Sequence, residues 1–117
     1  MGDRVVIQVV SKDEISPVAY GHWCGERAPR IVASLKERMK DRPGDVSYTF
    51  ARLMQEMIGD DDGALSFGAW NQERRLTADD SHGDAGCILI DVSKGFRCEC
   101  FGGYLETDKD GMPKVSP

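Results

Sequence analysis

The sequence lacks any apolar run long enough to cross a membrane. Its longest runs, Val5-Val6-Ile7 and Cys87-Ile88-Leu89-Ile90, fall far short of the roughly 20 residues that a spanning helix needs. The start Met1-Gly2-Asp3-Arg4 leads directly into a strand-like segment and has no export-signal character. Val6 stands where an acylation signal at Gly2 requires Ser or Thr. We therefore expect a cytoplasmic protein without a membrane or lipid anchor.

The chain has four cysteines and two histidines. In a reducing compartment the cysteines are expected to be thiols. Cys98 and Cys100 fall on one face of a predicted strand, in phase with Phe96, whereas structural zinc sites use pairs two to four residues apart at a turn. Packing in the core is therefore favoured, and no metal or cofactor is predicted. The alternative is a zinc site completed by Cys24, Cys87, His22 and His82.

Two further chemical motifs are weak. His22 and Cys24 are spaced as a base and a nucleophile could be on an extended segment, but spacing alone does not activate a thiol. Asp60-x-Asp62 resembles the start of a calcium loop, but Leu65 occupies the position where that loop needs Gly. No catalytic residue is predicted, and a protein without enzymatic activity is favoured.

Positive charge is in short supply and unevenly placed. The net charge is −5, which opposes direct binding to nucleic acid or to an anionic membrane. Residues 1–54 carry nine Lys or Arg against seven Asp or Glu, whereas residues 55–117 carry six against thirteen. Residues 27–42 hold six basic and two acidic residues, so one local basic face is expected in an acidic protein.

Helical spacing marks two segments. Ile31, Leu35 and Met39 recur every four residues after Pro29, which favours an amphipathic helix that ends before Pro43-Gly44. Asp45 is a good N-cap for a second helix. Gly59 provides its stop.

The remaining apolar segments predict strands over residues 4–10, 18–20, 64–70, 87–92 and 96–101, the last two joined as a hairpin. The order ββααβββ predicts an α+β domain: a mostly antiparallel sheet of four to five strands with both helices on one face. Residues 1–106 form this single domain. Residues 71–86 are a long polar connection, and residues 107–117 are expected to be a loose tail.

The densest group of functional residue types lies where a strand is followed by a helix. Exposed backbone N–H groups at a helix start favour anions, and the arginines add charge-assisted contacts. The group is either a ligand site for a stacked base and a phosphate or an anchor that fixes the helix to the sheet. Its members are Tyr20, His22, Trp23, Arg27 and Arg30.

Acidic residues gather in the predicted loops of the second half. They form either a solvated surface or a face that mimics phosphates toward a basic partner. The candidates are Asp60, Asp61, Asp62, Asp79, Asp80 and Asp84.

The segment Tyr20-Gly21-His22-Trp23-Cys24-Gly25 resembles small phage and prophage proteins of unassigned function, which carry a Tyr-x-His-Trp-x-Gly segment before a helix. The likeness extends through residues 47–52 and 63–68. It implies a phage accessory protein acting in the cytoplasm of a bacterial host cell, and no activity.

Small size, charge asymmetry and this resemblance lead to the expectation of an anti-CRISPR-like inhibitor. Its partner would be a host protein complex with a basic nucleic-acid-binding surface. The alternative is a small-molecule or nucleotide-signal binding protein that uses the group from Tyr20 to Arg30. The sequence indicates no oligomeric state.

Overall fold

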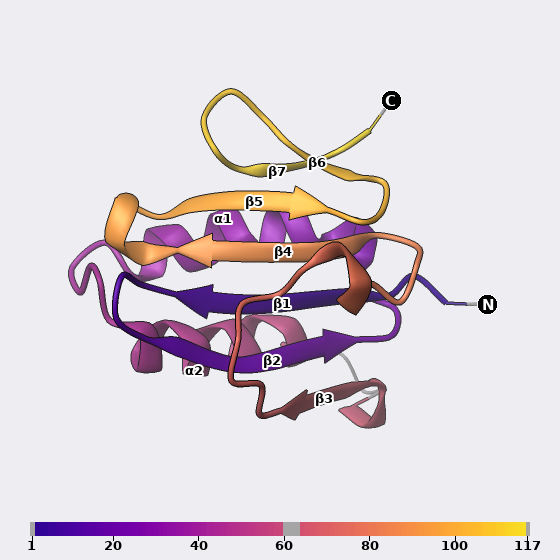
Figure 1. Ribbon diagram of the computed structural model, residues 1–117, viewed down its shortest axis with the longest axis horizontal. Helices are drawn as coiled ribbons and strands as arrows, with labels where there is room; N and C mark the ends of the chain where they lie inside the picture. The colour runs from indigo at the N-terminus through magenta and orange to yellow at the C-terminus, as the bar shows by residue number, and fades with distance from the viewer. Residues whose placement is uncertain (1, 60–63, 117) are drawn as a thin grey trace.

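The computed structural model describes residues 2–59 and 64–116, which form an α+β fold with a five-stranded main sheet and a separate two-stranded hairpin. The main sheet has the strand order β3-β2-β1-β4-β5, and both long helices cover one of its faces (Figure 1). The predicted fold class and the order ββααβββ are confirmed. The elements are β1 (Val5–Val10), β2 (Ile15–Gly21), α1 (Ala28–Arg38), α2 (Val46–Ile58), β3 (Phe67–Trp70), β4 (Gly86–Asp91) and β5 (Arg97–Phe101).

The central strand β1 is buried along all six residues. A strand covered on both faces reads as a continuous apolar run, which is why the segment Val5–Val10 contains one polar residue, Gln8. β1 pairs antiparallel with β2 and parallel with β4. The other two pairings in this sheet, β2 with β3 and β4 with β5, are antiparallel, as predicted for most of the sheet.

Alternation along β1 divides the core between the two faces of the sheet. Val5, Ile7 and Val9 point toward the helices and belong to one cluster with Leu35 of α1 and Leu53 of α2. Because successive strand residues point to opposite faces, the even-numbered residues of β1 face the side without helices. The larger core therefore lies between the sheet and the helix layer.

The second helix begins and ends as the sequence predicts. The Asp45 carboxylate accepts the backbone N–H of Tyr48 at 2.9 Å, which satisfies one of the free donors of the first turn. Gly59, with φ of 44°, follows the last helical residue. Within the described ranges, no helix combines the length and apolar character needed to cross a bilayer.

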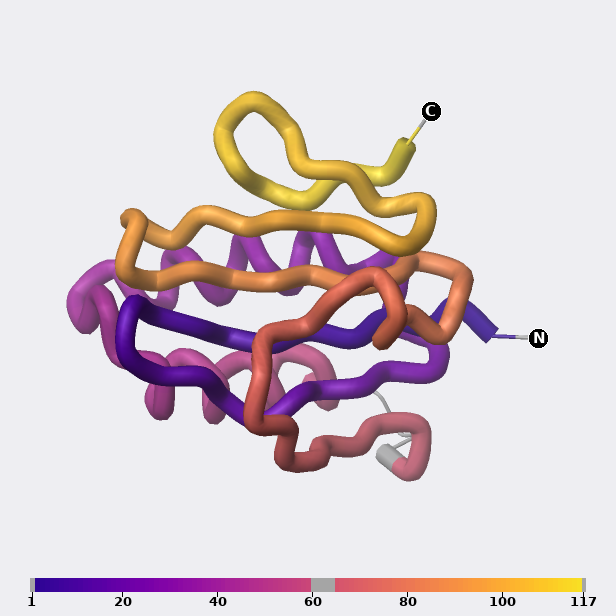
Figure 2. Tube along the Cα trace, in the orientation of Figure 1, coloured from indigo at the N-terminus to yellow at the C-terminus, as the bar shows by residue number. Residues whose placement is uncertain are grey.

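The helix-free face of the sheet is crossed by residues 71–86, which we call the strap (Figure 2). The fully buried Gln8 side chain holds it there. Its amide nitrogen donates to the carbonyls of Ser16 and Arg74, each at 3.1 Å, and its amide oxygen accepts the Leu76 N–H at 2.9 Å. The buried residues beneath and within the strap are Val6, Val10, Val18, Leu76, Cys87 and Leu89.

The C-terminal segment forms a hairpin rather than the loose tail predicted for residues 107–117. The Cys98 N–H donates to the Gly111 carbonyl at 2.7 Å, and the Tyr104 hydroxyl donates to the Asp3 carboxylate. These bonds fasten the hairpin beside β5 and to the start of the chain. Its strands are β6 (Leu105–Thr107) and β7 (Pro113–Val115), with Leu105 and Met112 packed on the helix-side core.

Candidate functional site

The residues of the Tyr20–Arg30 group do not form one site. Tyr20 follows Ala19 in β2 and therefore points to the helix-free face, where it packs against the small cluster under the strap. Arg27 and Arg30 belong to the start of the helix layer, where they line a groove between α1 and α2. The sheet therefore separates Tyr20 from Arg27 and Arg30.

Tyr20 instead meets two rings from the second half of the chain. It lies opposite Gly68 in the β2–β3 register, two residues before Trp70 in β3. The Tyr20 ring centroid is 6.0 Å from that of Trp70 and 5.0 Å from that of His82 in the strap. Trp70 and His82 are themselves 6.0 Å apart.

His22 extends this group toward the end of β2. Its Nδ1 lies 2.9 Å from the Tyr20 hydroxyl, and its ring meets Trp23 edge-to-face at 4.9 Å. The five rings of Tyr20, His22, Trp23, Trp70 and His82, which we call the aromatic surface, include both tryptophans and both histidines of the chain.

Trp23 and Trp70 remain exposed although they are large and apolar. Their relative exposures are 54% and 40%, respectively. The alternative in which Trp23 is a buried anchor between helix and sheet is therefore wrong. Exposed aromatic rings in mutual contact are typical of binding surfaces.

Two glycines make the turn that presents Trp23. A Cβ at Gly21 would lie 2.6 Å from the Cβ of the fully buried Cys24, and one at Gly25 would lie 2.6 Å from the Ala85 Cβ. The backbone of Asp3 clamps the same turn, because its carbonyl accepts the N–H groups of Cys24 at 3.0 Å and Gly25 at 2.9 Å. The turn is thus closed by tight packing, and Trp23 projects from a fixed backbone.

Cys24 lies in the helix-side core, whereas His22 belongs to the aromatic surface. Cys98 is buried in the same core, and burial raises the pKa of its thiol to about 12. Cys100 packs against this core. Among the described residues, no three His, Cys, Asp or Glu side chains are grouped closely enough to hold a metal ion.

The six aspartates of the predicted acidic face have different environments. Asp60, Asp61 and Asp62 lie outside the described residues. Asp79 is exposed, and Asp80 and Asp84 are both held in ion pairs within the chain.

The ion pairs of Asp80 and Asp84 fix the strap. The Asp80 carboxylate accepts two hydrogen bonds from the Arg74 guanidinium, at 2.8 and 2.9 Å, which lower the pKa of Asp80 to about 2. Asp84 accepts the backbone N–H and the Nε of Arg4, at 3.1 and 2.9 Å, and these bonds lower its pKa. Both carboxylates are therefore charged and held in place.

The strap brings Asp84 close to the aromatic surface. His82 lies between Asp80 and Asp84 in sequence, and His22 lies within electrostatic range of Asp84. We call the five rings together with Asp79, Asp80 and Asp84 the aromatic–acidic surface. Asp84 of the predicted acidic face thus lies near His22 of the Tyr20–Arg30 group, whereas Arg27 and Arg30 line the groove in the helix layer.

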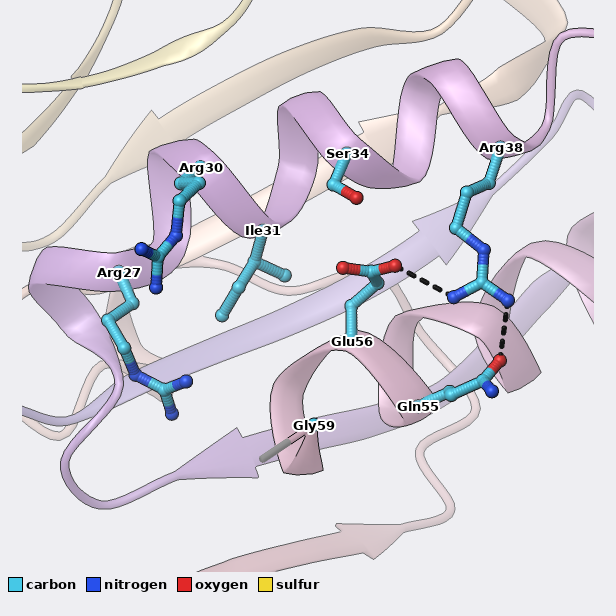
Figure 3. A pocket seen from close by; sticks show the side chains of 8 residues that line it. All are labelled: Arg27, Arg30, Ile31, Ser34, Arg38, Gln55, Glu56 and Gly59. Atoms are coloured by element: carbon cyan, nitrogen blue, oxygen red, sulfur yellow. Dashed lines mark hydrogen bonds and ion pairs between the residues drawn. The ribbon is translucent and has the colours of Figure 1, made fainter. Parts of the chain in front are cut away.

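The groove that contains the arginines lies between α1 and α2 and has a volume of about 800 Å³ (Figure 3). Arg38 of α1 donates to Glu56 and Gln55 of α2, each at 2.7 Å. Arg27 donates to the Met57 carbonyl at 3.3 Å. The residues that line the groove are Arg27, Arg30, Ile31, Ser34, Arg38, Gln55, Glu56 and Gly59.

Comparison with known protein families, with curated proteins and with solved structures finds no match to this chain. A functional assignment of the aromatic–acidic surface therefore rests on the geometry of that surface. Sequence reasoning missed Trp70 and His82 as members of the Tyr20 group. The contacts of Tyr20 with Trp70 and His82 depend on the β2–β3 register and on the path of the strap, which spacing along the sequence does not show.

Proposed function

We propose that this protein is a binding protein that docks on a partner protein through the aromatic–acidic surface. The observation that carries the proposal is the chain of five contacting rings in which Trp23 and Trp70 stay 54% and 40% exposed. Tryptophan and tyrosine dominate the binding energy of protein interfaces, since each offers a large rigid surface at low entropic cost.

The proposed partner surface is basic. Asp84 lies within electrostatic range of His22, Asp79 and Asp80 precede His82 in the strap, and the net charge of −5 favours approach to a positive surface. Two of the three carboxylates are fixed by Arg74 and Arg4, so the loss of side-chain entropy on binding is small. Cationic side chains of the partner also gain by lying over the exposed tryptophan faces.

The biological setting we propose is a phage accessory protein that inhibits a host complex with a nucleic-acid-binding surface, in the manner of anti-CRISPR proteins. The resemblance of the Tyr20–Gly25 segment to phage proteins and the acidic character of the chain support this setting. The partner's basic surface would then be covered by the aromatic–acidic surface and lost to nucleic acid.

A capture experiment with purified tagged protein and bacterial host lysate tests the proposal. The wild type is expected to retain one protein in stoichiometric amount, and Trp70→Ala is expected to lose it. Tyr48→Ala is the matched control, because Tyr48 is an exposed aromatic residue at 43% on α2, on the opposite face of the sheet. Loss of binding by both variants, or by neither, would contradict the assignment to this surface.

The electrostatic part of the proposal has its own test. Asp79 is exposed and forms no ion pair with another described residue, so Asp79→Lys reverses one charge without breaking an ion pair. We expect Asp79→Lys to associate more slowly than the wild type, and we expect salt to weaken the binding of the wild type more steeply than that of the variant. A complex that is insensitive to salt and to Asp79→Lys would show that the partner is not basic.

A further inference from the structure

A second, smaller pocket lies at the end of the molecule where the connection from α1 to α2 meets the turn between β4 and β5 (Figure 1). It has a volume of about 180 Å³, and we call it the end pocket. Its apolar walls are the buried side chains of Met39 at the end of α1 and of Val92 and Phe96 in the turn. Thr49 also lines it, so the end pocket lies at the opposite end of α2 from Gly59.

The backbone that forms one wall of the end pocket is strained. Gly95 and Phe96 follow each other in the left-handed region, with φ of 71° and 63°. A bulky aromatic residue rarely adopts this conformation, which costs on the order of 1–3 kcal/mol, and residues strained in this way cluster at binding sites. The turn thus holds the Phe96 ring in the pocket wall at a cost in backbone energy.

The volume of the end pocket decides what kind of group it can hold. Sites for whole small molecules usually measure roughly 300–1,000 Å³, so the end pocket is too small for most of them. An apolar cavity of about 150 Å³ binds one benzene molecule, so the end pocket matches a single bulky apolar side chain. Pockets that take one anchor side chain of a partner supply much of the binding energy at protein interfaces.

The rim of the end pocket is basic, although the chain has a net charge of −5. Lys36, Lys40 and Arg42 line the pocket, and none of the described lining residues is acidic. Lys40 is matched by Glu37 at 2.7 Å, and Arg42 is matched by Asp45 at 3.0 Å. Lys36 is exposed and forms no ion pair with a described residue. A carboxylate of a partner would therefore find an unmatched ammonium group directly beside the apolar walls.

We infer that the end pocket is a docking site for an acidic peptide segment of a partner protein. One bulky apolar side chain of the segment enters the pocket, and a neighbouring carboxylate pairs with Lys36. The aromatic–acidic surface selects a basic partner, so the end pocket recruits a segment of the opposite charge and does not rest on the proposed function.

Titration calorimetry of the full chain with synthetic peptides tests the inference. The first peptide is an acetylated and amidated pentapeptide with one phenylalanine between two pairs of glutamates. The second has alanine in place of the phenylalanine, and the third has lysines in place of the glutamates. The first is expected to bind about tenfold more tightly than either of the others, because it alone offers both the ring and the carboxylates.

The position of the bound peptide is tested in the same full chain by NMR. The methyl signals of Met39 and Val92 are expected to shift when the first peptide is added and to stay in place with the alanine peptide. Shifts confined to residues outside the end pocket would contradict the assignment of the site.

Lys36→Glu is expected to weaken binding of the first peptide about fivefold, because it replaces an attraction with a repulsion at the rim. The matched control is Arg30→Glu, which makes the same charge change at an exposed residue of α1 that does not line the end pocket. Both variants are expected to melt like the wild type. Trp70→Ala should keep peptide binding, which separates this inference from the proposed function.

Three further results would overturn the inference. The first is the absence of binding by the first peptide at millimolar concentration, or equal binding by the alanine or lysine peptide. The second is equal loss of binding in Lys36→Glu and Arg30→Glu. The third is binding of phenylacetate as tight as that of the first peptide, because the end pocket would then be a site for a small aromatic acid.

Discussion

Replacing Gln8 with Leu tests whether one buried side chain holds the strap on the sheet. The two side chains have similar volumes, so the change removes hydrogen bonds without opening a large cavity. Gln8 is fully buried and makes three hydrogen bonds, to the Ser16 and Arg74 carbonyls and from the Leu76 N–H. After substitution these backbone groups remain at or near the buried sheet surface without their partner.

The cost follows from the number of groups left unpaired. Each buried unsatisfied polar group costs about 1–3 kcal/mol, and the strap relaxes enough to rehydrate some of them, so we expect a total of about 3–5 kcal/mol. For a domain of this size, roughly 4 °C of melting temperature is lost per kcal/mol, which gives a decrease of about 12–20 °C. This is a large share of the roughly 5–15 kcal/mol that stabilises a typical domain.

Thermal denaturation followed by circular dichroism measures the effect, and hydrogen exchange at the Leu76 amide locates it. Gln55→Leu is the matched control, because Gln55 is exposed on α2 and the same substitution should cost less than about 1 kcal/mol. Faster exchange at Leu76 is expected in the Gln8 variant only. Equal melting temperatures for the two variants would refute the role given to Gln8.

Three further predictions concern single contacts. The pKa of Asp80 is lowered to about 2, mainly by Arg74, so the stability that this ion pair contributes should be present above pH 4 and lost as the pH falls through 2. In urea denaturation, the free energy of unfolding should therefore fall less between pH 4 and pH 2 in Arg74→Ala than in the wild type. Gly25→Ala places a Cβ 2.6 Å from the Ala85 Cβ, so we expect its melting temperature to fall by more than about 3 °C. A smaller decrease would show that the turn can shift to accommodate the methyl group. Burial raises the pKa of Cys98 to about 12, so alkylation of this thiol at pH 8, followed by mass spectrometry, should be slow in the native protein and fast in urea.

The sequence predicts the local elements of the fold well because their signals are local. Asp45 and Gly59 delimit α2 through caps that involve a few neighbouring residues. The parallel pairing of β1 with β4 and the folded C-terminal hairpin depend instead on contacts between the two ends of the chain, such as the bond from Tyr104 to Asp3. Periodicity within a segment carries no information on such partners.

The candidate site shows the same limit. Tyr20 and Arg30 are close in sequence and were grouped as one site. Because side chains alternate along β2, Tyr20 points to the helix-free face of the sheet, whereas Arg30 lies in α1 on the other face. The contact of Tyr20 with Trp70 depends on the register of β2 with β3, and its contact with His82 depends on where Gln8 fixes the strap. Neither can be read from spacing.

During synthesis β1 leaves the ribosome long before its parallel neighbour exists, because Val5 pairs with Gly86, about eighty residues later. At translation rates of roughly 5–20 residues per second, the central strand waits for several seconds with one edge open. An apolar strand with an unpaired edge is a template for pairing with other chains. The nascent protein is therefore most exposed to aggregation, and most in need of a chaperone, while residues 11–85 are being made.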